Sequence, residues 1–324
     1  MKAARLFSTG DIRLVEEPIP TPRSDEYLIR VTSVGLCGSD LHWFNDAGIG
    51  DARLKKPLVL GHEIAGMTEF GQRVAVDPAI SCGNCRPCKE GNPNLCTDLR
   101  FAGHGENDGA LRERIAWPKK CLYSIPTEMN SLDGCMLEPL GIAIHAVDLG
   151  KIRTGMRVGV FGCGPIGLLV IQTARAAGAV DILVTEPLPH RMAAAEKFGA
   201  KPWSPGEEVD VAFECAGVNE AVEDALMAVK PGGRVLLIGI PDNDETLFTA
   251  SIARRKGLTI LLVRRMKFTY PRAIKLILNG QVDTRSLITH KFQLDEIGKA
   301  FATASRREGL KVVVQVSQDK AEVG

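Results

Sequence analysis

Four cysteines within fifteen residues have the types and spacing to bind a metal. Cys82, Cys85, Cys88 and Cys96 follow the pattern C-x2-C-x2-C-x7-C. Four thiolates complete a tetrahedral zinc shell and leave no coordination position for a substrate. An iron–sulfur cluster is an alternative, although its fourth cysteine usually follows the third after three residues and precedes a proline. A disulfide framework is another, and it is typical of small secreted domains. The spacing favours a structural zinc over both.

A second set of metal-binding residue types lies outside this cluster. It comprises Cys37, His62, Glu63 and Glu138. A thiolate, an imidazole and a carboxylate would give zinc three protein ligands and leave one position open. An alcohol bound there would lose its proton near neutral pH. Each residue alone is ordinary, since a lone cysteine is usually a small buried hydrophobe.

A glycine-rich turn supplies the second half of a possible hydride-transfer site. Gly162-Cys163-Gly164-Pro165-Ile166-Gly167 follows an expected strand and opens an expected helix. Such glycines permit a tight turn and let the backbone approach a pyrophosphate at the helix N-terminus. Glu186 ends the next expected strand, where a carboxylate can accept the ribose hydroxyls of NAD and repel the 2′-phosphate of NADP. Arg191 could instead hold that phosphate, so the prediction of NAD depends on Glu186.

The elements that must position these groups change in character along the chain. The first 140 residues are expected to be mostly β, with strands at 27–34, 73–76 and 112–116. The later part alternates expected strands at 157–162, 181–186, 209–214, 234–240 and 259–263 with expected helices from 166 and over 220–229. This alternation predicts a parallel sheet with helices on both faces. The connection between 201 and 209 is too short to hold a crossover helix.

Composition limits the possible classes of protein. The 324 residues are 45% hydrophobic and 24% charged, with 40 basic and 39 acidic residues and a net charge of +1. Neither nucleic acid nor an anionic membrane is expected as a partner. The expected location is the cytoplasm, since free cysteines suit a reducing compartment and the N-terminus lacks the apolar core of a signal peptide.

Six motifs in a fixed order resemble those of one enzyme family. They are Cys37-Gly38-Ser39-Asp40, Gly61-His62-Glu63, the four-cysteine run, Leu137-Glu138-Pro139-Leu140, the glycine-rich turn, and Leu287-Ile288-Thr289-His290-Lys291-Phe292. The chain resembles the zinc-dependent medium-chain dehydrogenases, in the polyol (sorbitol and xylitol) and threonine/butanediol dehydrogenase branch. The resemblance implies an α/β protein with two domains: a discontinuous, mostly β GroES-like catalytic domain over 1–140 and 265–324, and a doubly wound Rossmann domain over 141–264. It also implies two zinc ions per chain and NAD.

The resemblance also implies roles for particular residues. Cys37 and His62 would hold the catalytic zinc, with either Glu63 or Glu138 as the third protein ligand. Ser39 and His42 would pass the alcohol proton to solvent. The cofactor would contact Gly162, Gly164, Pro165, Ile166, Gly167, Glu186 and Arg191. The substrate would contact Trp43, Phe101, His104 and Arg265, although Trp43, His104 and Met266 depart from the residues usual in sorbitol enzymes. Asp40 is interpreted as a structural turn carboxylate.

The expected function is therefore the reversible, NAD-linked oxidation of a polyol or other secondary alcohol to the ketone. A threonine or butanediol dehydrogenase is the alternative within the family. A non-catalytic zinc- and nucleotide-binding protein on the same fold is the alternative from another class. A small-molecule alcohol is the expected partner, and a homo-oligomer, either a tetramer or a dimer, is the expected assembly.

Overall fold

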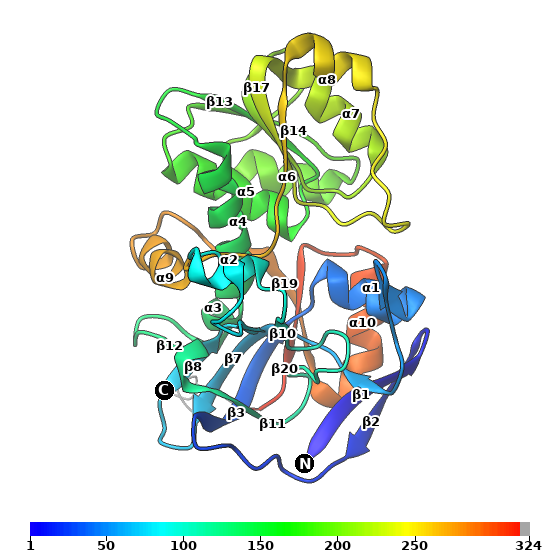
Figure 1. Cartoon of the computed structure of the whole chain (residues 1–324), viewed down its shortest axis with the longest axis vertical. Coiled ribbons are helices and arrows are strands. Elements are labelled where there is room, and N and C mark those ends of the chain that lie inside the picture. The colour runs from blue at the N-terminus through cyan, green and yellow to red at the C-terminus, as the bar shows by residue number, and fades with distance from the viewer. Residues whose placement is uncertain (318–324) are drawn as a thin grey trace. The chain divides into compact units, whose positions relative to one another are not determined.

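The computed structural model describes residues 1–317, and the chain divides into two compact units (Figure 1). Of the described residues, the first unit comprises Met1–Glu138, Tyr270–Leu278 and 284–317. The second comprises Pro139–Thr269 and Asn279–Asp283. The first unit is therefore discontinuous in sequence, and the second is inserted into it.

A seven-stranded sheet forms the centre of the first unit. Its strands run in the order β12-β8-β7-β3-β20-β19, with β11 also pairing β3. Their bounds are Leu122–Ser124 (β12), Arg73–Val76 (β8), Glu63–Thr68 (β7), Glu26–Gly35 (β3), Lys311–Gln315 (β20), Ile288–Gln293 (β19) and Arg114–Pro118 (β11). A three-stranded sheet has the order β2-β1-β6, with bounds Asp11–Glu16, Lys2–Ser8 and Leu58–Val59. Two two-stranded antiparallel sheets pair β4 (Gly48–Ile49) with β5 (Ala52–Arg53) and β9 (Ala79–Ile80) with β10 (Arg100–Phe101).

The α-helices of the first unit are short. They are α1 (Gly38–Asp46), α2 (Arg86–Lys89), α3 (Ser131–Cys135), α9 (Tyr270–Leu278) and α10 (Ile297–Ser305). The core gathers buried side chains of β1, β3, β7 and β20 against Ala300 and Phe301 of α10. Burial of this apolar surface, at about 25 cal/mol per Å², is the main term that holds the elements together.

The second unit is a doubly wound parallel sheet. Its six strands run in the order β15-β14-β13-β16-β17-β18, and every neighbouring pair is parallel. The bounds are Lys201–Pro202 (β15), Asp181–Thr185 (β14), Arg157–Phe161 (β13), Val209–Glu214 (β16), Val229–Leu237 (β17) and Thr259–Leu262 (β18). Helices α5 (Pro165–Ala176) and α6 (Pro189–Lys197) contact each other, as do α7 (Asn219–Ala228) and α8 (Ala250–Lys256). Figure 1 shows these two pairs covering opposite faces of the sheet, and α4 (Leu137–Gly150) leads into the unit. The predicted α/β fold class is confirmed.

Several predicted boundaries need correction. The strand expected at 112–116 runs over Arg114–Pro118, because Arg112 instead forms an isolated bridge with Ala3 of β1. The strand expected at 234–240 begins earlier, at Val229, and ends at Leu237. The strand starts early because Val229 pairs with Val209, and the register of the pairing then shifts between Val209 and Val211. Residues 203–208 contain no helix, as the short connection predicted.

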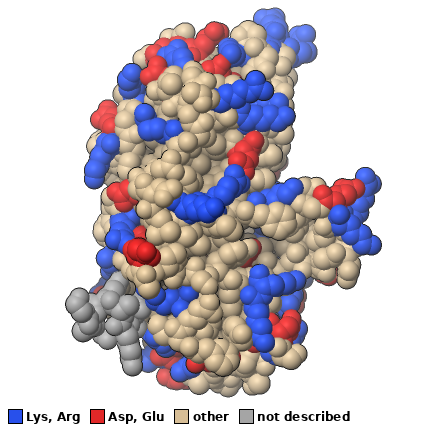
Figure 2. Space-filling model, turned by 90° about the vertical axis from the view of Figure 1, so that its left-hand side faces the viewer, with Lys and Arg blue, Asp and Glu red and all other residues tan. Residues whose placement is uncertain are grey.

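The surface carries charges of both signs. On the face drawn in Figure 2, lysine and arginine side chains are scattered among aspartate, glutamate and broad uncharged areas. Within residues 1–317, no helix is long and apolar enough to cross a membrane.

Candidate functional site

The turn between β3 and α1 carries Cys37 just beyond the end of β3, a strand in the middle of the first unit's sheet. Cys37 immediately precedes α1, and its backbone N–H donates to Asp40 Oδ2 at 3.0 Å. Asp40 Oδ1 accepts from the backbone N–H of Gly61 at 3.0 Å. One fully buried carboxylate therefore ties the Cys37 turn to the strand segment that carries His62 and Glu63.

Asp40 also orients the imidazole of His62. The Nδ1 atom of His62 lies 3.4 Å from Asp40 Oδ1, and both side chains are buried. Burial lowers the pKa of His62, but Asp40 and the Cys37 sulfur together raise it well above its ordinary value. A carboxylate on one ring nitrogen fixes the other nitrogen for a metal. Asp40 is thus more than the turn carboxylate that the sequence suggested.

Glu63 completes a group of three potential ligands. The ligand atoms of Cys37, His62 and Glu63 all lie within 4.8 Å of one another. Strand register places Gly35 opposite Glu63, and a Cβ on Gly35 would come within 1.9 Å of Glu63 Oε2. The glycine therefore makes the space that the carboxylate occupies. A thiolate, an imidazole and a carboxylate at this separation fit a zinc ion with an open position.

A buried lysine, absent from the sequence-based set, pairs with Glu63. Lys311 Nζ lies 2.5 Å from both carboxylate oxygens, and the two side chains are 2% and 1% exposed. Burial lowers the pKa of Lys311, but Glu63 and Cys37 outweigh it and raise the net value. The only sequence signal was a lysine at the head of the β-branched run of β20. The Lys311 ammonium therefore lies directly against the Glu63 carboxylate inside the first unit.

Glu138 lies near this group without joining it. It is buried in the first turn of α4, and it does not belong to the set of ligand atoms within 4.8 Å. Burial raises the pKa of Glu138 to about 7, with Glu63 adding to the rise and His62 and Lys311 opposing it. Of the two carboxylates that the sequence left open, Glu63 is the one beside Cys37 and His62.

Ser39 and His42 occupy the start of α1. Ser39 Oγ lies 3.5 Å from His62 Nε2. His42 follows one turn later, and its Nδ1 lies 3.8 Å from Asp46 Oδ2, whose side chain is 59% exposed. Residues three and four apart share one face of a helix. This face of α1 therefore carries Ser39 next to His62 and His42 next to the exposed Asp46.

Aromatic rings of the first unit include one that packs on a ligand residue. Phe101 packs on His62 with ring centroids 5.2 Å apart, and Trp43 meets His104 edge to face at 5.5 Å. His104 lies in a loop fixed by Asp108, which accepts from Arg5 and from the backbone N–H of Val59. Three of the four predicted substrate residues, Trp43, Phe101 and His104, thus lie in the unit that holds Cys37 and His62.

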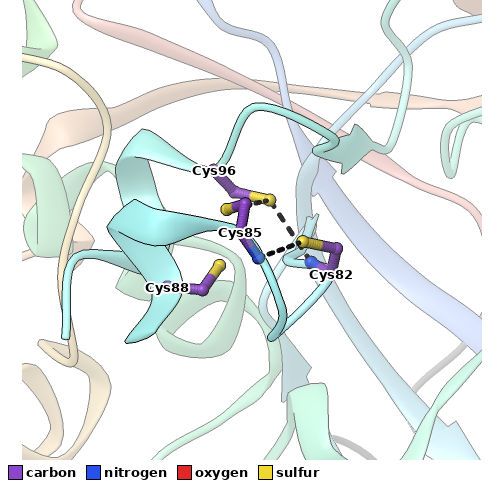
Figure 3. A group of neighbouring side chains, drawn as sticks. All are labelled: Cys82, Cys85, Cys88 and Cys96. Atoms are coloured by element: carbon purple, nitrogen blue, oxygen red, sulfur yellow. Dashed lines mark hydrogen bonds between the residues drawn. The ribbon is translucent and has the colours of Figure 1, made fainter. Parts of the chain in front are cut away.

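The four-cysteine lobe forms a separate cluster (Figure 3). The sulfur atoms of Cys82, Cys85, Cys88 and Cys96 all lie within 4.8 Å of one another, and none forms a disulfide. The sulfurs of Cys85 and Cys96 are 3.8 Å apart. A zinc tetrahedron with bonds of about 2.3 Å has edges of about 3.8 Å, so the cluster fits the metal.

The electrostatics of this lobe also favour a bound cation. Backbone N–H groups of Cys88 and Thr97 lower the pKa of Cys85 to about 6. Burial and the neighbouring Cys85 sulfur raise the pKa of Cys88 to about 12. Without a metal, further thiolates are disfavoured beside the first, whereas four thiolates bound to zinc are stable.

The glycine-rich turn lies between β13 and α5 in the second unit. Gly162 has φ +99°, which favours glycine, and Gly164 precedes Pro165 at the start of α5. A Cβ on Gly167 would come within 2.0 Å of the Gly162 carbonyl oxygen. The three glycines therefore satisfy the backbone requirements of a dinucleotide turn. Ile166 is half-buried in the first turn of the helix.

Glu186 and Arg191 lie beside this turn. Glu186 Oε2 accepts from the backbone N–H of Cys163 at 2.7 Å, and Oε1 accepts from that of Leu188 at 3.0 Å. A Cβ on Gly164 would lie 3.6 Å from an Arg191 guanidinium nitrogen. The structure thus brings both candidate cofactor-specificity residues to the glycine-rich turn. Arg265, the remaining predicted substrate residue, follows β18 in this unit with φ +56°.

Comparisons with known proteins agree with these two groups of residues. Residues 23–127 match the family model for the alcohol dehydrogenase GroES-like domain, and residues 165–279 match that for zinc-binding dehydrogenases. The chain belongs to the zinc-binding dehydrogenase family. This dehydrogenase is 35% identical to sorbitol dehydrogenase of Bacillus subtilis, over 97% of each chain.

Two further relatives extend the comparison. L-idonate 5-dehydrogenase of Vitis vinifera is 31% identical, over 94% of this chain and 91% of the relative. A solved structure of a zinc-binding dehydrogenase from Sinorhizobium meliloti, bound to NADP, has a TM-score of 0.89 and 31% identity, covering 97% of this chain and 99% of that one. The dehydrogenase thus belongs to the polyol branch of its family, and it is an oxidoreductase. The alternative of a non-catalytic binding protein is not supported.

Proposed function

We propose that this dehydrogenase oxidises a polyol or a related secondary alcohol with NAD, using one catalytic and one structural zinc ion. The observation that carries the proposal is the approach of Cys37, His62 and Glu63 to within 4.8 Å beside Asp40. When bound, zinc would acidify the alcohol and NAD would accept the hydride. Sorbitol and idonate dehydrogenases among the relatives support polyols as the substrate class.

The chain's own residues would act on the proton and on orientation. Asp40 would keep Nδ1 of His62 protonated, because it accepts from that side of the ring. Ser39, 3.5 Å from His62 Nε2, would accept the alcohol proton. His42 would pass it on toward the exposed Asp46. The buried Lys311 would hold the charge and position of Glu63.

Four side chains would contact the rest of the substrate. Phe101, Trp43 and His104 would supply apolar contact and a ring nitrogen near the reacting carbon. We propose that Arg265 contacts substrate hydroxyls through its donor fork. Arg265→Ala should then raise KM for a polyol by roughly ten- to a hundredfold more than for a simple secondary alcohol. Equal increases for both alcohols would assign Arg265 to the cofactor or to the fold.

NAD specificity is proposed from Glu186. Its carboxylate would accept the ribose hydroxyls and oppose a 2′-phosphate. Arg191 near Gly164 and the NADP-bound relative favour the opposite choice, so NAD and NADP must be compared directly. We also propose a cytoplasmic location, for which the nine free cysteines are suited, and a homo-oligomer, which light scattering would test.

One assay tests the function. Purified protein of known zinc content is given NAD or NADP with sorbitol, xylitol, L-idonate, 2,3-butanediol or L-threonine, and absorbance at about 340 nm is followed. The proposal expects about two zinc ions per chain and the highest kcat/KM with a polyol and NAD. A preference for threonine or butanediol would select the alternative within the family. No turnover with any alcohol by zinc-loaded protein would refute the proposed chemistry.

A further inference from the structure

A buried carboxylate in the second unit has no role in the steps above. Glu214 is 1% exposed and is the last residue of β16, a central strand of the parallel sheet. Register aligns it with Phe161, after which the glycine-rich turn begins, and Phe161 in turn aligns with Thr185, which precedes Glu186. Glu214 therefore lies at the edge of the sheet where a dinucleotide binds in such folds.

The Glu214 side chain collects backbone N–H groups from two loops. Its Oε1 accepts from Ala216 at 2.7 Å and from Gly217 at 2.6 Å. Burial raises the pKa of Glu214, while the backbone N–H groups of Gly217, Ala216, Gly239 and Val218 oppose the rise by hydrogen bonding. Gly239 follows β17, the next strand of the sheet. The carboxylate of Glu214 thus holds the loop after β16, while its main-chain carbonyl accepts from the Gly239 N–H at 3.2 Å and so holds the loop after β17.

The loop after β16 packs directly on the glycine-rich turn, and the loop after β17 packs on the loop after β16. A Cβ on Gly162 would come within 2.8 Å of Ala216 Cβ, and Cys215 N–H donates to the Phe161 carbonyl at 2.8 Å. A Cβ on Gly239 would come within 2.1 Å of the Gly217 nitrogen. A displacement at Ala216 or Gly217 would therefore push on Gly162.

The outer side of the same loop is open. Glu214 is fully covered, whereas Ala216 is exposed and Val218 is 43% exposed. On its buried side, the loop after β16 donates backbone hydrogen bonds to the Glu214 carboxylate, and hydrogen bonds to a charged acceptor are stronger than those to a neutral one. Outside, the loop presents small apolar side chains to solvent next to Gly162. This arrangement suits a surface that must keep its shape for a ligand.

We propose that Glu214 is a positioning residue for the cofactor, because its carboxylate holds the backbone at Ala216 and Gly217 in the shape that keeps the glycine-rich turn ready for a nicotinamide dinucleotide. The inference rests on the proposed use of such a cofactor. It extends that proposal to a residue that touches neither the cofactor nor the substrate.

Glu214→Gln is the variant that tests this role. The amide keeps one oxygen for Ala216 and Gly217, but it removes the negative charge and puts an NH2 group in place of Oε2, which lies 2.7 Å from where a Cβ on Gly239 would be. Glu220→Gln is the matched control, since Glu220 is exposed in the first turn of α7 six residues later. NADH affinity is measured by ligand fluorescence, and kcat is measured at saturating NAD.

The expected result is a loss confined to cofactor binding. For Glu214→Gln, the Kd for NADH should rise by about tenfold or more, as expected when a charge-assisted hydrogen bond is lost. Its kcat at saturating NAD should stay within about twofold of the wild type, with zinc content unchanged, and Glu220→Gln should bind NADH normally. Hydrogen exchange at Ala216 and Gly217 should become faster in Glu214→Gln alone.

Other outcomes separate the two proposals. If the wild type fails to bind NADH, the proposed cofactor is wrong. If the wild type binds NADH and a folded Glu214→Gln binds it equally well, the positioning role is wrong. A parallel loss of kcat, zinc and NADH affinity would show a general structural role and would also overturn it. If Glu214→Gln does not fold, Glu214→Asp, which keeps the charge one methylene shorter, should bind NADH several-fold more weakly, and unchanged affinity would refute the inference.

Discussion

Replacing Lys311 by methionine should leave Glu63 as an unpaired carboxylate inside the first unit. Lys311 Nζ lies 2.5 Å from both Glu63 oxygens, and the two side chains are 2% and 1% exposed. Methionine fills a similar volume without charge. Removing one partner of such a buried pair typically costs about 3–5 kcal/mol.

Protonation of Glu63 sets an upper limit on the unfolding free energy that Lys311→Met can lose. A glutamic acid with the ordinary pKa of about 4.3 is neutralised at pH 7 at a cost of about 3.7 kcal/mol, and at pH 5 at a cost of about 1 kcal/mol. The unpaired side chain is more easily protonated in the folded state than in the unfolded state, so the destabilisation is present at high pH and declines as pH falls. We therefore expect Lys311→Met to lose about 3–4 kcal/mol at pH 7 and about 1 kcal/mol at pH 5 in the metal-free protein.

Urea unfolding of chelator-treated protein measures this loss. Trp43 and Trp117 are buried in the first unit, and replacing Trp203 by phenylalanine in all samples removes the tryptophan of the second unit from the signal. Glu63→Gln/Lys311→Met is the control, because it removes both charges and should recover at least half of the stability lost by Lys311→Met. A loss below about 1 kcal/mol at pH 7, or no change between pH 7 and pH 5, would refute the reasoning.

Three more predictions follow from the same structure. Cys88→Ser should lose the structural zinc and several kcal/mol of unfolding free energy, as measured by elemental analysis and urea unfolding, whereas Cys121→Ser, buried outside the lobe, should keep the metal. Glu186→Ser should reduce the NAD over NADP ratio of kcat/KM by about tenfold or more, and an unchanged ratio would assign the choice to Arg191. Because burial raises the pKa of Glu138 to about 7, the metal-free protein should lose about 3 kcal/mol of stability as pH rises from about 4.5 to 7. Glu138→Gln should flatten that pH dependence in unfolding curves.

The parallel sheet was the part of the fold most open to prediction. Strands β13, β14, β16 and β18 were predicted to within one residue of each end, whereas the two-residue edge strand β15 was not predicted. Buried parallel strands form continuous apolar runs, and glycines mark their ends. The start of β17 at Val229 was missed, because it depends on pairing with Val209 across a Pro-Gly-Gly sequence that favours a turn. Long-range pairing overrides local preference there.

The site was predictable where residue type determines the chemistry. Cysteine, histidine and glycine spacing identified the three groups of residues, but spacing could not say which carboxylate lies beside Cys37 and His62. That depends on the register of β3 against β7, which sets Gly35 opposite Glu63. Lys311 is 248 residues from Glu63 along the chain, so only the folded sheet reveals the pair. Asp40 was visible, but its contact with His62 was not.

The zinc content of Cys37→Ser, measured on the same sample as its turnover, tests the central claim most directly. Cys37, His62 and Glu63 form one metal group, and the four-cysteine lobe forms another. The account predicts that zinc falls from about two to about one per chain, that alcohol oxidation is lost, and that the far-ultraviolet circular dichroism is unchanged. A folded Cys37→Ser protein that keeps two zinc ions and oxidises alcohols at the wild-type rate would contradict it.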